Sequence, residues 1–209
     1  MRVDLSCFAD PQANLNYDDQ LLREAETGAG EVMHFWESSS YFVVLGRTGK
    51  EEEDVNIDAV TTDRIPVLRR SSGGGTVLQG PGCLNFSVIL SKKERPVLES
   101  ISGSYVYILE RVVNALRELG VAAVFRPICD LALEPTQQKF SGNAQRRGRQ
   151  YILHHGTILY AFDLERISKY LRMPCKMPEY RQARPHADFI ANISLRPEAI
   201  RQAIIRHFS

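Results

Sequence analysis

Three consecutive glycines follow two arginines and two serines in the stretch Arg69–Val77. Glycine leaves backbone N–H groups unshielded and permits positive φ values, so a ligand can approach the main chain closely. The arginines add fixed positive charge that suits a phosphate or a carboxylate. The stretch therefore predicts an anion-binding loop, although a flexible glycine turn flanked by solvated arginines has the same composition. It lacks the lysine and hydroxyl residue that follow the last glycine of a Walker loop, and the chain contains no GxGxxG fingerprint.

A second informative stretch begins at Lys139 and runs through small residues to Arg146. A lysine beside small residues can approach the oxygen of a ligand as a point charge, but an exposed strand residue has the same sequence context. Downstream stands His154-His155-Gly156-Thr157. Adjacent residues of a strand point to opposite faces, so the two histidines are not expected to share one metal ion. One of them is expected to be structural.

In their order and spacing, these segments resemble the biotin and lipoate protein ligases and octanoyltransferases, in the lipoate branch of that family. The resemblance extends from about the first helix to beyond Asp163. It rests on the double arginine before the triple glycine, the Leu84–Ser87 strand with its asparagine, the Lys-x-Ser-Gly-x-Ala-x stretch and the His-His-Gly-Thr strand. Two features depart from the family pattern. Gln79 stands where the family usually has histidine, and the chain ends soon after Asn192, without the small C-terminal domain of many lipoate ligases.

The resemblance implies an ATP-dependent lipoate-protein ligase that forms lipoyl-AMP and transfers the lipoyl group to a lysine of an apo carrier domain. It implies Lys139 as the catalytic residue, against the acyl carbonyl and the α-phosphate, with Arg70 helping to neutralise the acyl phosphate. The implied binding residues for substrate and adenylate are Arg70, Ser72, Gly73, Gly74, Gly75, Thr76, Val77, Asn85, Ser141, Gly142, Ala144, His155, Gly156 and Thr157. Candidates for the wall of the apolar acyl tunnel are Val77, Leu84 and Phe86, for which core packing is an equal or better explanation.

The same resemblance implies ATP, Mg²⁺ and lipoate as the small molecules, with Asp130 as the magnesium ligand. Its implied partners are lipoyl carrier domains: the E2 component of a 2-oxo acid dehydrogenase, the glycine-cleavage carrier protein or a lipoate-binding protein. A separate small accessory subunit is a further expected partner. The proline- and arginine-rich stretch Pro178–His186 is either a loop that closes over the adenylate or meets the carrier, or a solvated connector.

An octanoyltransferase, which carries octanoyl from acyl carrier protein through a cysteine thioester, is the alternative within this family. Its nucleophile would be Cys175, which follows the His-Gly strand, or Cys129, which lies upstream of Lys139. A buried inert thiol is the competing interpretation of both cysteines. A non-catalytic module that binds an acyl or adenylate group is a third hypothesis, which the intact Lys139 and glycine loop disfavour.

Periodicity along the chain predicts an α+β fold with a mixed, largely antiparallel sheet and packed helices, similar to the catalytic domain of biotin and lipoate protein ligases. Val32–Trp36 and Tyr41–Leu45 are predicted to form a hairpin around the Glu37–Ser40 turn, and 50–54 to form a solvated loop. The predicted helices are 14–29, 104–119, 164–171 and 197–208. The remaining predicted strands are 1–8, 66–69, 84–90, 122–125, 138–145 and 151–161.

The 209 residues are expected to form one catalytic domain, residues 1–209. With 26 basic and 25 acidic residues the net charge is +1, which provides no bulk attraction to nucleic acid or to an anionic membrane. No apolar run approaches the roughly 20 residues of a membrane span, and the first residues do not resemble a signal peptide. A cytoplasmic protein is therefore expected. The four cysteines contain no CxxC pair, so reduced thiols are expected rather than a zinc site or disulfides.

Overall fold

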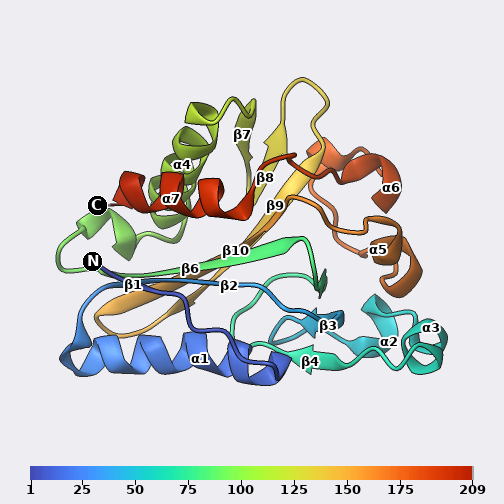
Figure 1. The fold of residues 1–209 in the computed structure, drawn as a ribbon, viewed down its shortest axis with the longest axis horizontal. Helices are drawn as coiled ribbons and strands as arrows, with labels where there is room; N and C mark the ends of the chain where they lie inside the picture. Colours follow the sequence, from blue (N-terminus) through green and yellow to red (C-terminus); the bar gives the residue numbers. More distant parts are fainter. Residues whose placement is uncertain (209) are drawn as a thin grey trace.

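The computed structural model describes residues 1–208, which fold around two β-sheets of unequal size (Figure 1). The seven-stranded sheet has the order β1 (Arg2–Asp4), β2 (Val32–Trp36), β6 (Cys83–Ser91), β10 (Tyr151–Leu159), β9 (Lys139–Arg147), β8 (Asp130–Leu133) and β7 (Ala123–Arg126). The three-stranded sheet has the order β4 (Val67–Arg69), β3 (Phe42–Leu45) and β5 (Val77–Gln79). Only the β1–β2 and β3–β4 pairs are parallel among the named strands of residues 1–208, so the prediction of a mixed and largely antiparallel α+β fold is confirmed.

Helices cover both faces of the large sheet. Helix α1 (Pro11–Glu24) lies on one face, whereas α4 (Ile101–Glu118) and α7 (Pro197–Phe208) lie together on the other (Figure 1). Their apolar sides pack against the central strands, and for this reason all nine residues of β6 are buried. A strand that is buried on both faces reads as a nearly continuous apolar run rather than as an alternation.

The helix ends follow ordinary capping chemistry. Asp10 accepts a hydrogen bond from the Gln12 amide at the start of α1, and Ser100 does the same for the Gly103 amide at the start of α4. Gly120, predicted to stop the second of these helices, has φ of +83° and ends it in the left-handed conformation. Helix α1 ends at Glu24 and continues into a wider π-type turn, Ala25–Ala29.

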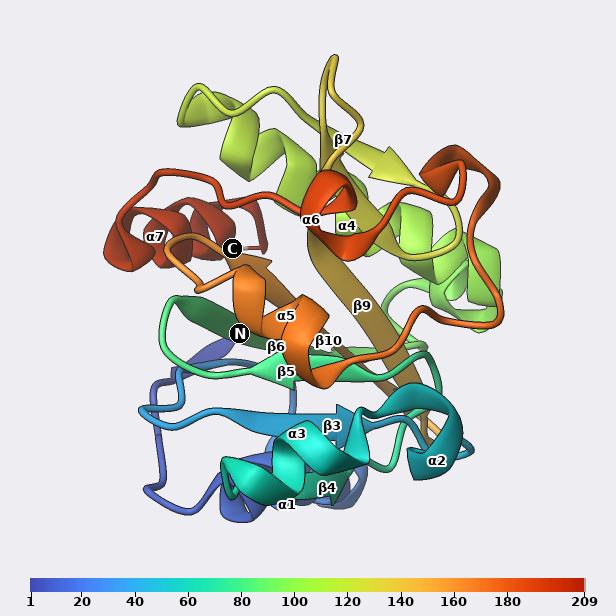
Figure 2. The same cartoon turned by 90° about the vertical axis from the view of Figure 1, so that its right-hand side faces the viewer.

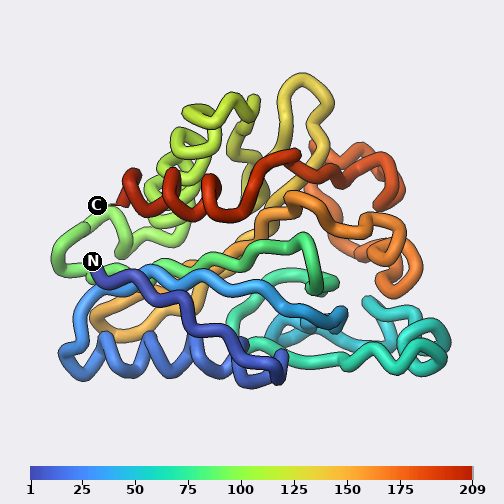
Figure 3. The backbone as a smooth tube through the Cα atoms, in the orientation of Figure 1, coloured from blue at the N-terminus to red at the C-terminus, as the bar shows by residue number. Residues whose placement is uncertain are grey.

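The small sheet is covered by α2 (Glu51–Asp54), α3 (Ile57–Thr62), α5 (Glu165–Tyr170) and α6 (His186–Phe189), and it borders the large sheet (Figure 2). The backbone trace shows the segment from α5 to α6 passing beside the beginning of β9 (Figure 3), where Arg184 bonds to the Thr136 and Gln137 carbonyl oxygens. Among residues 1–208, no helix has the combination of length and apolar character that crossing a bilayer requires.

Several sequence-based expectations about strand pairing and local secondary structure were wrong. β2 and β3 do not form a hairpin: β2 pairs with β1 and β6 of the large sheet, whereas β3 pairs with β4 and β5. The residues between them carry the chain from one sheet to the other. The charge run 51–54 is a short exposed helix, α2, rather than a loop. Strands β5 and β8, which both border the site described below, were not predicted.

Candidate active site

Two adjoining cavities lie where the glycine loop faces strands β6, β9 and β10. The inner cavity measures about 130 Å³ and the outer cavity about 600 Å³. Eight residues line both of them: Gly75, Thr76, Val77, Cys129, Asp130, Lys139, Gly142 and Thr157. Lys139 is the lysine at this junction, and its side chain is 28% exposed.

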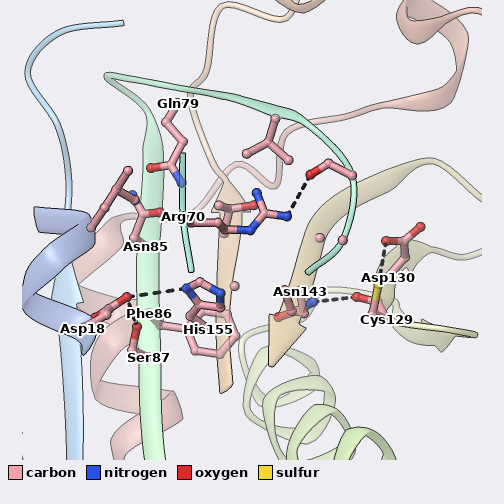
Figure 4. A pocket seen from close by; sticks show the side chains of 18 of the residues that line it. Asp18, Arg70, Gln79, Asn85, Phe86, Ser87, Cys129, Asp130, Asn143 and His155 are labelled. Atoms are coloured by element: carbon pink, nitrogen blue, oxygen red, sulfur yellow. Dashed lines mark hydrogen bonds and ion pairs between the residues drawn. The ribbon is translucent and has the colours of Figure 1, made fainter. Parts of the chain in front are cut away.

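The register of the central strands assembles the floor of the inner cavity. Gly156 on β10 lies directly opposite Phe86 on β6 and Asn143 on β9. A Cβ on Gly156 would lie 1.9 Å from the Asn143 side-chain oxygen and 2.8 Å from the Phe86 ring. Glycine is therefore required at this position so that the neighbouring side chains can meet over the strand. Asn143 in turn donates a 2.8 Å hydrogen bond to the Cys129 carbonyl oxygen, as Figure 4 shows.

Lys139 forms an ion pair with Asp130 across the β8–β9 ladder, with 2.7 Å between Nζ and Oδ1. The other Asp130 oxygen accepts a 2.7 Å hydrogen bond from the Tyr180 hydroxyl. A Cβ on Gly142 would lie only 3.0 Å from the Lys139 Nζ, so the glycine leaves room for the ammonium group. Burial and the Asp130 charge raise the pKa of the Tyr180 hydroxyl, which therefore remains a hydrogen-bond donor.

The guanidinium group of Arg70 holds the glycine loop together from the inside. Its Nη2 donates to the Gly73 and Gly75 carbonyl oxygens at 2.8 and 2.7 Å, and its Nε donates to the Ser72 hydroxyl at 3.1 Å. Gly74 between them has φ of +90°, which favours glycine. Burial lowers the pKa of Arg70 to about 10, so the group stays charged at neutral pH. Arg70 lines the inner cavity, but its donors are directed at the loop.

A second loop, between β3 and α2, supports the glycine loop from outside. Arg69 donates through Nη1 to the carbonyl oxygens of Gly46 and Gly49, both at 2.8 Å. Gly46 packs so closely that a Cβ there would lie 2.0 Å from the Gly74 carbonyl oxygen. The Thr76 hydroxyl donates to Asp54 Oδ2 at 2.6 Å and ties the far end of the glycine loop to α2.

A buried carboxylate on α1, Asp18, connects the helix to the glycine loop. It accepts hydrogen bonds from His34 Nδ1 at 2.9 Å and from the Ser87 hydroxyl at 2.7 Å, and its Oδ2 lies 3.5 Å from His155 Nδ1 (Figure 4). The other His155 nitrogen, Nε2, lies 2.6 Å from the Ser72 hydroxyl. A chain of contacts therefore runs from Arg70 through Ser72 and His155 to Asp18.

The protonation of this network follows from its partners. Burial alone would raise the pKa of Asp18, but the hydrogen bonds and charges of His155 and His34 lower it to about 2. Both ring nitrogens of His34 face acceptors, because Nε2 lies 2.8 Å from the Ser6 carbonyl oxygen. Both nitrogens can therefore donate when the ring is protonated. Burial opposes its charge, yet the net pKa of His34 is raised because the hydrogen bond and charge of Asp18 prevail.

The adjacent histidines separate as expected, with His155 beside the inner cavity and His154 on the opposite face of β10. His154 is buried against the Tyr105 and Phe86 rings, and burial lowers its pKa to about 3. It is therefore a neutral structural histidine. Among the described residues, no cluster of three or more His, Cys, Asp and Glu side chains converges on a metal-sized space.

Most site residues predicted from the sequence converge on the two cavities. The lining includes Arg70, Gly74, Gly75, Thr76, Val77, Asn85, Phe86, Cys129, Asp130, Lys139, Ser141, Gly142, Ala144, His155, Gly156 and Thr157. Ser72 and Gly73 lie behind this lining, where Ser72 contacts His155 and Arg70. Leu84, a candidate for the acyl tunnel, instead lies in the core beneath α4.

The two candidate cysteines differ in position. Cys129 lines both cavities beside Asp130, and burial together with that carboxylate raises the pKa of its thiol. A raised pKa disfavours the thiolate that a nucleophile needs. Cys175 is exposed and lies outside the lining of both cavities, although Pro174 and Lys176 on either side of it belong to the outer one.

Sequence reasoning left five polar or aromatic residues of the inner cavity out of the predicted site: Asp18, Trp36, Gln79, Ser87 and Asn143. Gln79 was noted only as a departure from the family pattern. The signal for Asp18 was its position three residues after Leu15 and three before Leu21, which places a carboxylate on the buried face of α1. Trp36 is the chain's one tryptophan. Ser87 and Asn143 lie in strands. Long-range strand pairing decides which face of such a strand borders the cavity, so the local sequence does not identify these two residues.

The segment around Pro178–His186 forms a wall of the outer cavity. Arg184 holds it to the β8–β9 turn through the Thr136 and Gln137 carbonyl oxygens, at 3.1 and 2.9 Å. Arg181 is buried, and its guanidinium carbon lies 4.5 Å from the centroid of the Phe189 ring on α6. Basic side chains that line the cavity are Lys139, Arg172, Lys176, Arg181 and His186, and apolar ones include Phe140, Leu159, Ile167, Leu171 and Ile190.

Comparison with known proteins places this site in a family. The model of the lipoyl protein ligase A/B catalytic domain matches residues 10–209. A probable lipoate-protein ligase A of Mycoplasma pneumoniae is 34% identical over 164 residues, which cover 78% of this chain and 46% of the relative. The chain thus spans less than half the length of this curated relative.

Solved structures agree. A bipartite lipoate protein ligase of Thermoplasma acidophilum, studied with its E2 lipoyl domain, has a TM-score of 0.86 and 27% identity over all of this chain and 82% of its own. A lipoate-protein ligase A bound with ATP has a TM-score of 0.82 and 28% identity, covering 100% of this chain and 83% of that one. A putative lipoate protein ligase from T. acidophilum with bound lipoic acid has a TM-score of 0.80 and 26% identity, with 100% and 84% covered. This chain belongs to the lipoyl protein ligase A/B catalytic domain family.

Proposed function

We propose that this chain is an ATP-dependent lipoate-protein ligase, and that residues 1–209 form its single catalytic domain. The observation that carries the proposal is the position of Lys139 at the junction of a small inner cavity and a large outer one. A ligase must bring a carboxylate and a nucleotide phosphate together at one cation. The solved relatives bound with ATP and with lipoic acid support the two occupants.

In the first step, an oxygen of the lipoate carboxylate attacks the α-phosphorus of ATP, and the bond to pyrophosphate breaks. Negative charge builds on the phosphate oxygens as this happens, so a fixed cation there lowers the barrier. The Lys139 ammonium group takes this role, and the backbone N–H groups of the glycine loop add neutral donors. The acyl chain occupies the inner cavity between Val77, Phe86 and the β9–β10 floor.

In the second step, the neutral ε-amine of a carrier lysine attacks the acyl carbonyl carbon. The carbonyl oxygen becomes negatively charged, AMP leaves, and the amine nitrogen loses a proton to solvent as the amide forms. Lys139 again supplies a fixed cation, because it lines both the proposed acyl cavity and the proposed nucleotide cavity. The same lysine therefore stabilises both transition states, because each develops negative charge on oxygen atoms beside it.

The outer cavity suits a nucleotide in both size and chemistry. Arg172, Lys176 and Arg181 are cations that can meet phosphate oxygens, whereas Leu159, Ile167 and Leu171 give an apolar surface for a base. Asp130 is the proposed magnesium ligand, because Mg²⁺ is commonly held by one or two carboxylates together with substrate phosphates. To bind the ion, one Asp130 oxygen would exchange its contact with Lys139 or Tyr180 for the metal. Bound there, the ion would neutralise phosphate charge beside Lys139.

We further propose lipoyl carrier domains as the acceptors, which the bipartite Thermoplasma acidophilum ligase studied with its E2 lipoyl domain supports. The glycine-cleavage carrier protein and a lipoate-binding protein belong to the same class of acceptor. A separate accessory polypeptide that completes the adenylate site is part of this proposal, which the bipartite organisation of the Thermoplasma acidophilum ligase supports.

The test is an acyl-transfer assay read by intact-protein mass spectrometry. The purified chain is mixed with an apo lipoyl domain and either lipoate with Mg-ATP or octanoyl carrier protein without nucleotide. We expect an ATP-dependent gain of one lipoyl mass on the carrier, with AMP released. A carrier variant whose acceptor lysine is replaced by arginine is the matched control.

Other outcomes have defined meanings. A mass gain from octanoyl carrier protein alone would replace this proposal by a cysteine transferase, with Cys129 rather than Cys175 next to Lys139. Lipoyl-AMP formed without transfer would leave activation standing and place the carrier step with an accessory polypeptide. Absence of both adenylate and transfer, in a chain that remains folded, would overturn the proposal.

A further inference from the structure

Two carboxylates from different helices hold the two ends of the glycine run Gly73–Gly75. The Ser71 hydroxyl donates to Asp19 Oδ1 on α1, and the Thr76 hydroxyl donates to Asp54 Oδ2 on α2, both at 2.6 Å. Ser71 precedes the run by two residues, and Thr76 follows it directly. Glycine has the widest backbone freedom of the residues, so the course of the run depends on what holds its ends.

The anchor at the beginning of the loop lies outside the two cavities. Asp54 and Thr76, at the other end, line the outer cavity, where a ligand can reach them. Asp19 and Ser71 belong to the lining of neither cavity, and the Asp19 side chain is only 17% exposed. A change at Asp19 therefore reaches a ligand only through the groups that Asp19 holds.

Asp19 has a second partner on a third element. The Arg146 Nη1 on β9 lies 2.7 Å from the same Asp19 oxygen that accepts from Ser71. The Arg146 side chain is 42% exposed, so solvent weakens this ion pair. The Ser71 contact is partly buried, and hydrogen bonds to a carboxylate are stronger than those between neutral groups. Of the two contacts, the one to the loop is therefore expected to matter more.

The neighbouring carboxylate holds the next serine. Asp18 lies 3.5 Å from His155 Nδ1, and His155 Nε2 lies 2.6 Å from the Ser72 hydroxyl. The Ser72 carbonyl oxygen also accepts a 2.8 Å hydrogen bond from the Arg47 N–H. Two consecutive carboxylates of α1 thus hold two consecutive serines, and the freedom of the loop begins only after them.

We propose that Asp19 is a positioning residue, which acts through Ser71 to fix where the glycine loop presents its backbone N–H groups. This inference rests on the proposed function, in which those N–H groups meet the negative charge that develops during activation. Dipoles that are held in place stabilise a transition state more than dipoles that must first be ordered. Asp19 thus contributes to the rate of activation without contacting the substrate.

Kinetics of lipoate-dependent pyrophosphate exchange separate the contact with Ser71 from the contact with Arg146. Asp19→Ala removes both and should lower kcat about tenfold, with a smaller change in the KM for lipoate. Asp19→Asn keeps an oxygen that can accept from Ser71 but loses the charge that attracts Arg146, and it should restore most of the rate. Asp58→Ala, at an exposed position on α3, is the matched control and should leave kcat unchanged.

A double-mutant cycle tests whether the effect passes through Ser71. Ser71→Ala should lower kcat by the same factor as Asp19→Ala. The double variant should lose no more than either single variant, because removing one end of a hydrogen bond already abolishes it. Losses that multiply in the double variant, or an Asp19→Asn rate as low as that of Asp19→Ala, would assign the effect to Arg146 and overturn the inference.

Nitrogen-15 relaxation of the unliganded chain, labelled at glycine, measures the loop without catalysis. In Asp19→Ala the order parameters of Gly73–Gly75 should fall from about 0.85 toward about 0.6, the range of a flexible backbone. Asp19→Asn should keep the values of the unaltered chain. Gly120, at the end of α4, is the internal control and should not change in either variant.

The two measurements distinguish failure of this inference from failure of the proposed function. Unchanged order parameters in Asp19→Ala would overturn the inference whether or not the chain is a ligase. Lower order parameters with an unaltered kcat would also overturn it, while the ligase proposal stands. If the unaltered, folded chain catalyses no pyrophosphate exchange, the proposed function fails together with the catalytic role of the loop, and the relaxation data still decide whether Asp19 holds it.

Discussion

At the scale of single residues, the ion pair between Lys139 and Asp130 governs the charge of the site. Asp130 is buried, and it balances the ammonium group until a substrate arrives. In the proposed mechanism, a carboxylate and a phosphate that enter the two cavities would compete with Asp130 for the same cation. The pair thus holds the ammonium group at the junction of the two cavities in the absence of ligand.

Replacing Lys139 by alanine should lower the rate of lipoate-dependent pyrophosphate exchange by about 10²–10³-fold, because a fixed cation at the transition state is lost. Thermal unfolding should show that the variant is still folded, because Asp130 then keeps its hydrogen bond from Tyr180 and a 4.0 Å contact from the Cys129 thiol. The matched control is Lys93→Ala, which removes an exposed lysine outside both cavities. Exchange at the unaltered rate in Lys139→Ala would remove this residue from the proposed mechanism.

Asp18 and His34 give the protein a defined stability profile against pH. The pKa of Asp18 falls from 3.8 to about 2 on folding, so its stabilisation is present above pH 3.8 and is lost as pH falls toward 2. That difference corresponds to roughly 2 kcal/mol of the free energy of unfolding. The pKa of His34 is raised above 6.5, so its contribution is present below pH 6.5 and is lost as pH rises through the raised value.

Buried His154, whose pKa is lowered to about 3, removes stability as pH falls below 6.5, because the unfolded chain then binds a proton that the folded chain does not. The free energy of unfolding should therefore be highest near pH 6.5 and decline on either side. Denaturant titrations from about pH 2 to 8 measure this curve. In Asp18→Asn the decline should flatten on both sides, since one carboxylate supports both shifts. Asp188→Asn, an exposed position on α6, should leave the curve unchanged. An identical pH profile in Asp18→Asn would show that the pair does not set it.

Site residues could be predicted from the sequence where they belong to a contiguous motif, and were missed where only long-range packing brings them to the site. Lys139, Gly142 and the glycine loop are contiguous motifs, and the structure brings them together. Asp18 and Trp36 were missed because their neighbours in sequence are ordinary helix and strand residues. Their place in the cavity depends on α1 and β2 packing beside β6, which no short window encodes.

At the scale of elements, the glycine loop depends on close packing against a second loop. Gly46→Ala would drive a Cβ into the Gly74 carbonyl oxygen and should cost about 1–3 kcal/mol of stability. Gly75→Ala meets no described atom within 4 Å, so it should leave stability nearly unchanged while weakening substrate binding, because Gly75 lines both cavities.

Chemical denaturation and the pyrophosphate-exchange KM separate these two effects. Gly73→Ala is the control, since its Cβ has open space among the described residues and lies behind the cavity lining. Equal stability of Gly46→Ala and Gly73→Ala would mean that the two loops are not held as closely as the structure shows. A KM unchanged in Gly75→Ala would argue against substrate contact with the loop.

Elements were predicted well where their pattern is local and poorly where partner choice decides. The periodic apolar positions of α4 and its terminal glycine specify a helix without reference to the rest of the chain. The β2 and β3 segments were identified as strands, but their sequences do not say that each pairs with a different sheet. Strand pairing depends on cross-strand and same-face neighbours that lie far away in sequence.

At the scale of the whole molecule, α7 closes the core on the face opposite α1. Ile200, Ala203 and Ile204 of this helix are fully buried against α4 and the sheet. Ile204→Ala should lower the free energy of unfolding by about 2–5 kcal/mol without changing the KM for lipoate, because the lost contacts lie outside the cavities. Urea titration beside the exchange assay measures both quantities.

The exposed Ile101→Ala change is the control for the same chemistry at the surface and should cost far less. A rise in KM for Ile204→Ala comparable to its loss of stability would show that the helical layer shapes the site. The layered arrangement itself was predictable, because amphipathic helices and clustered strands need each other to bury their apolar faces. The division of the strands into two sheets was not, since it arises from the three-dimensional course of the β2–β3 connection.

The inward orientation of Arg70 has a consequence for how the loop meets an anion. In a trans peptide the C=O of one residue and the N–H of the next point in opposite directions. Because the Gly73 and Gly75 carbonyl oxygens point at the guanidinium, the N–H groups of Gly74 and Thr76 point away from it. The arginine thus sets the direction of neutral dipoles in advance, and in the proposed mechanism those dipoles would need no reorganisation when negative charge develops. Lysine in its place would keep the charge and lose this preorganisation, because a single ammonium group cannot hold two carbonyls in a fixed planar arrangement.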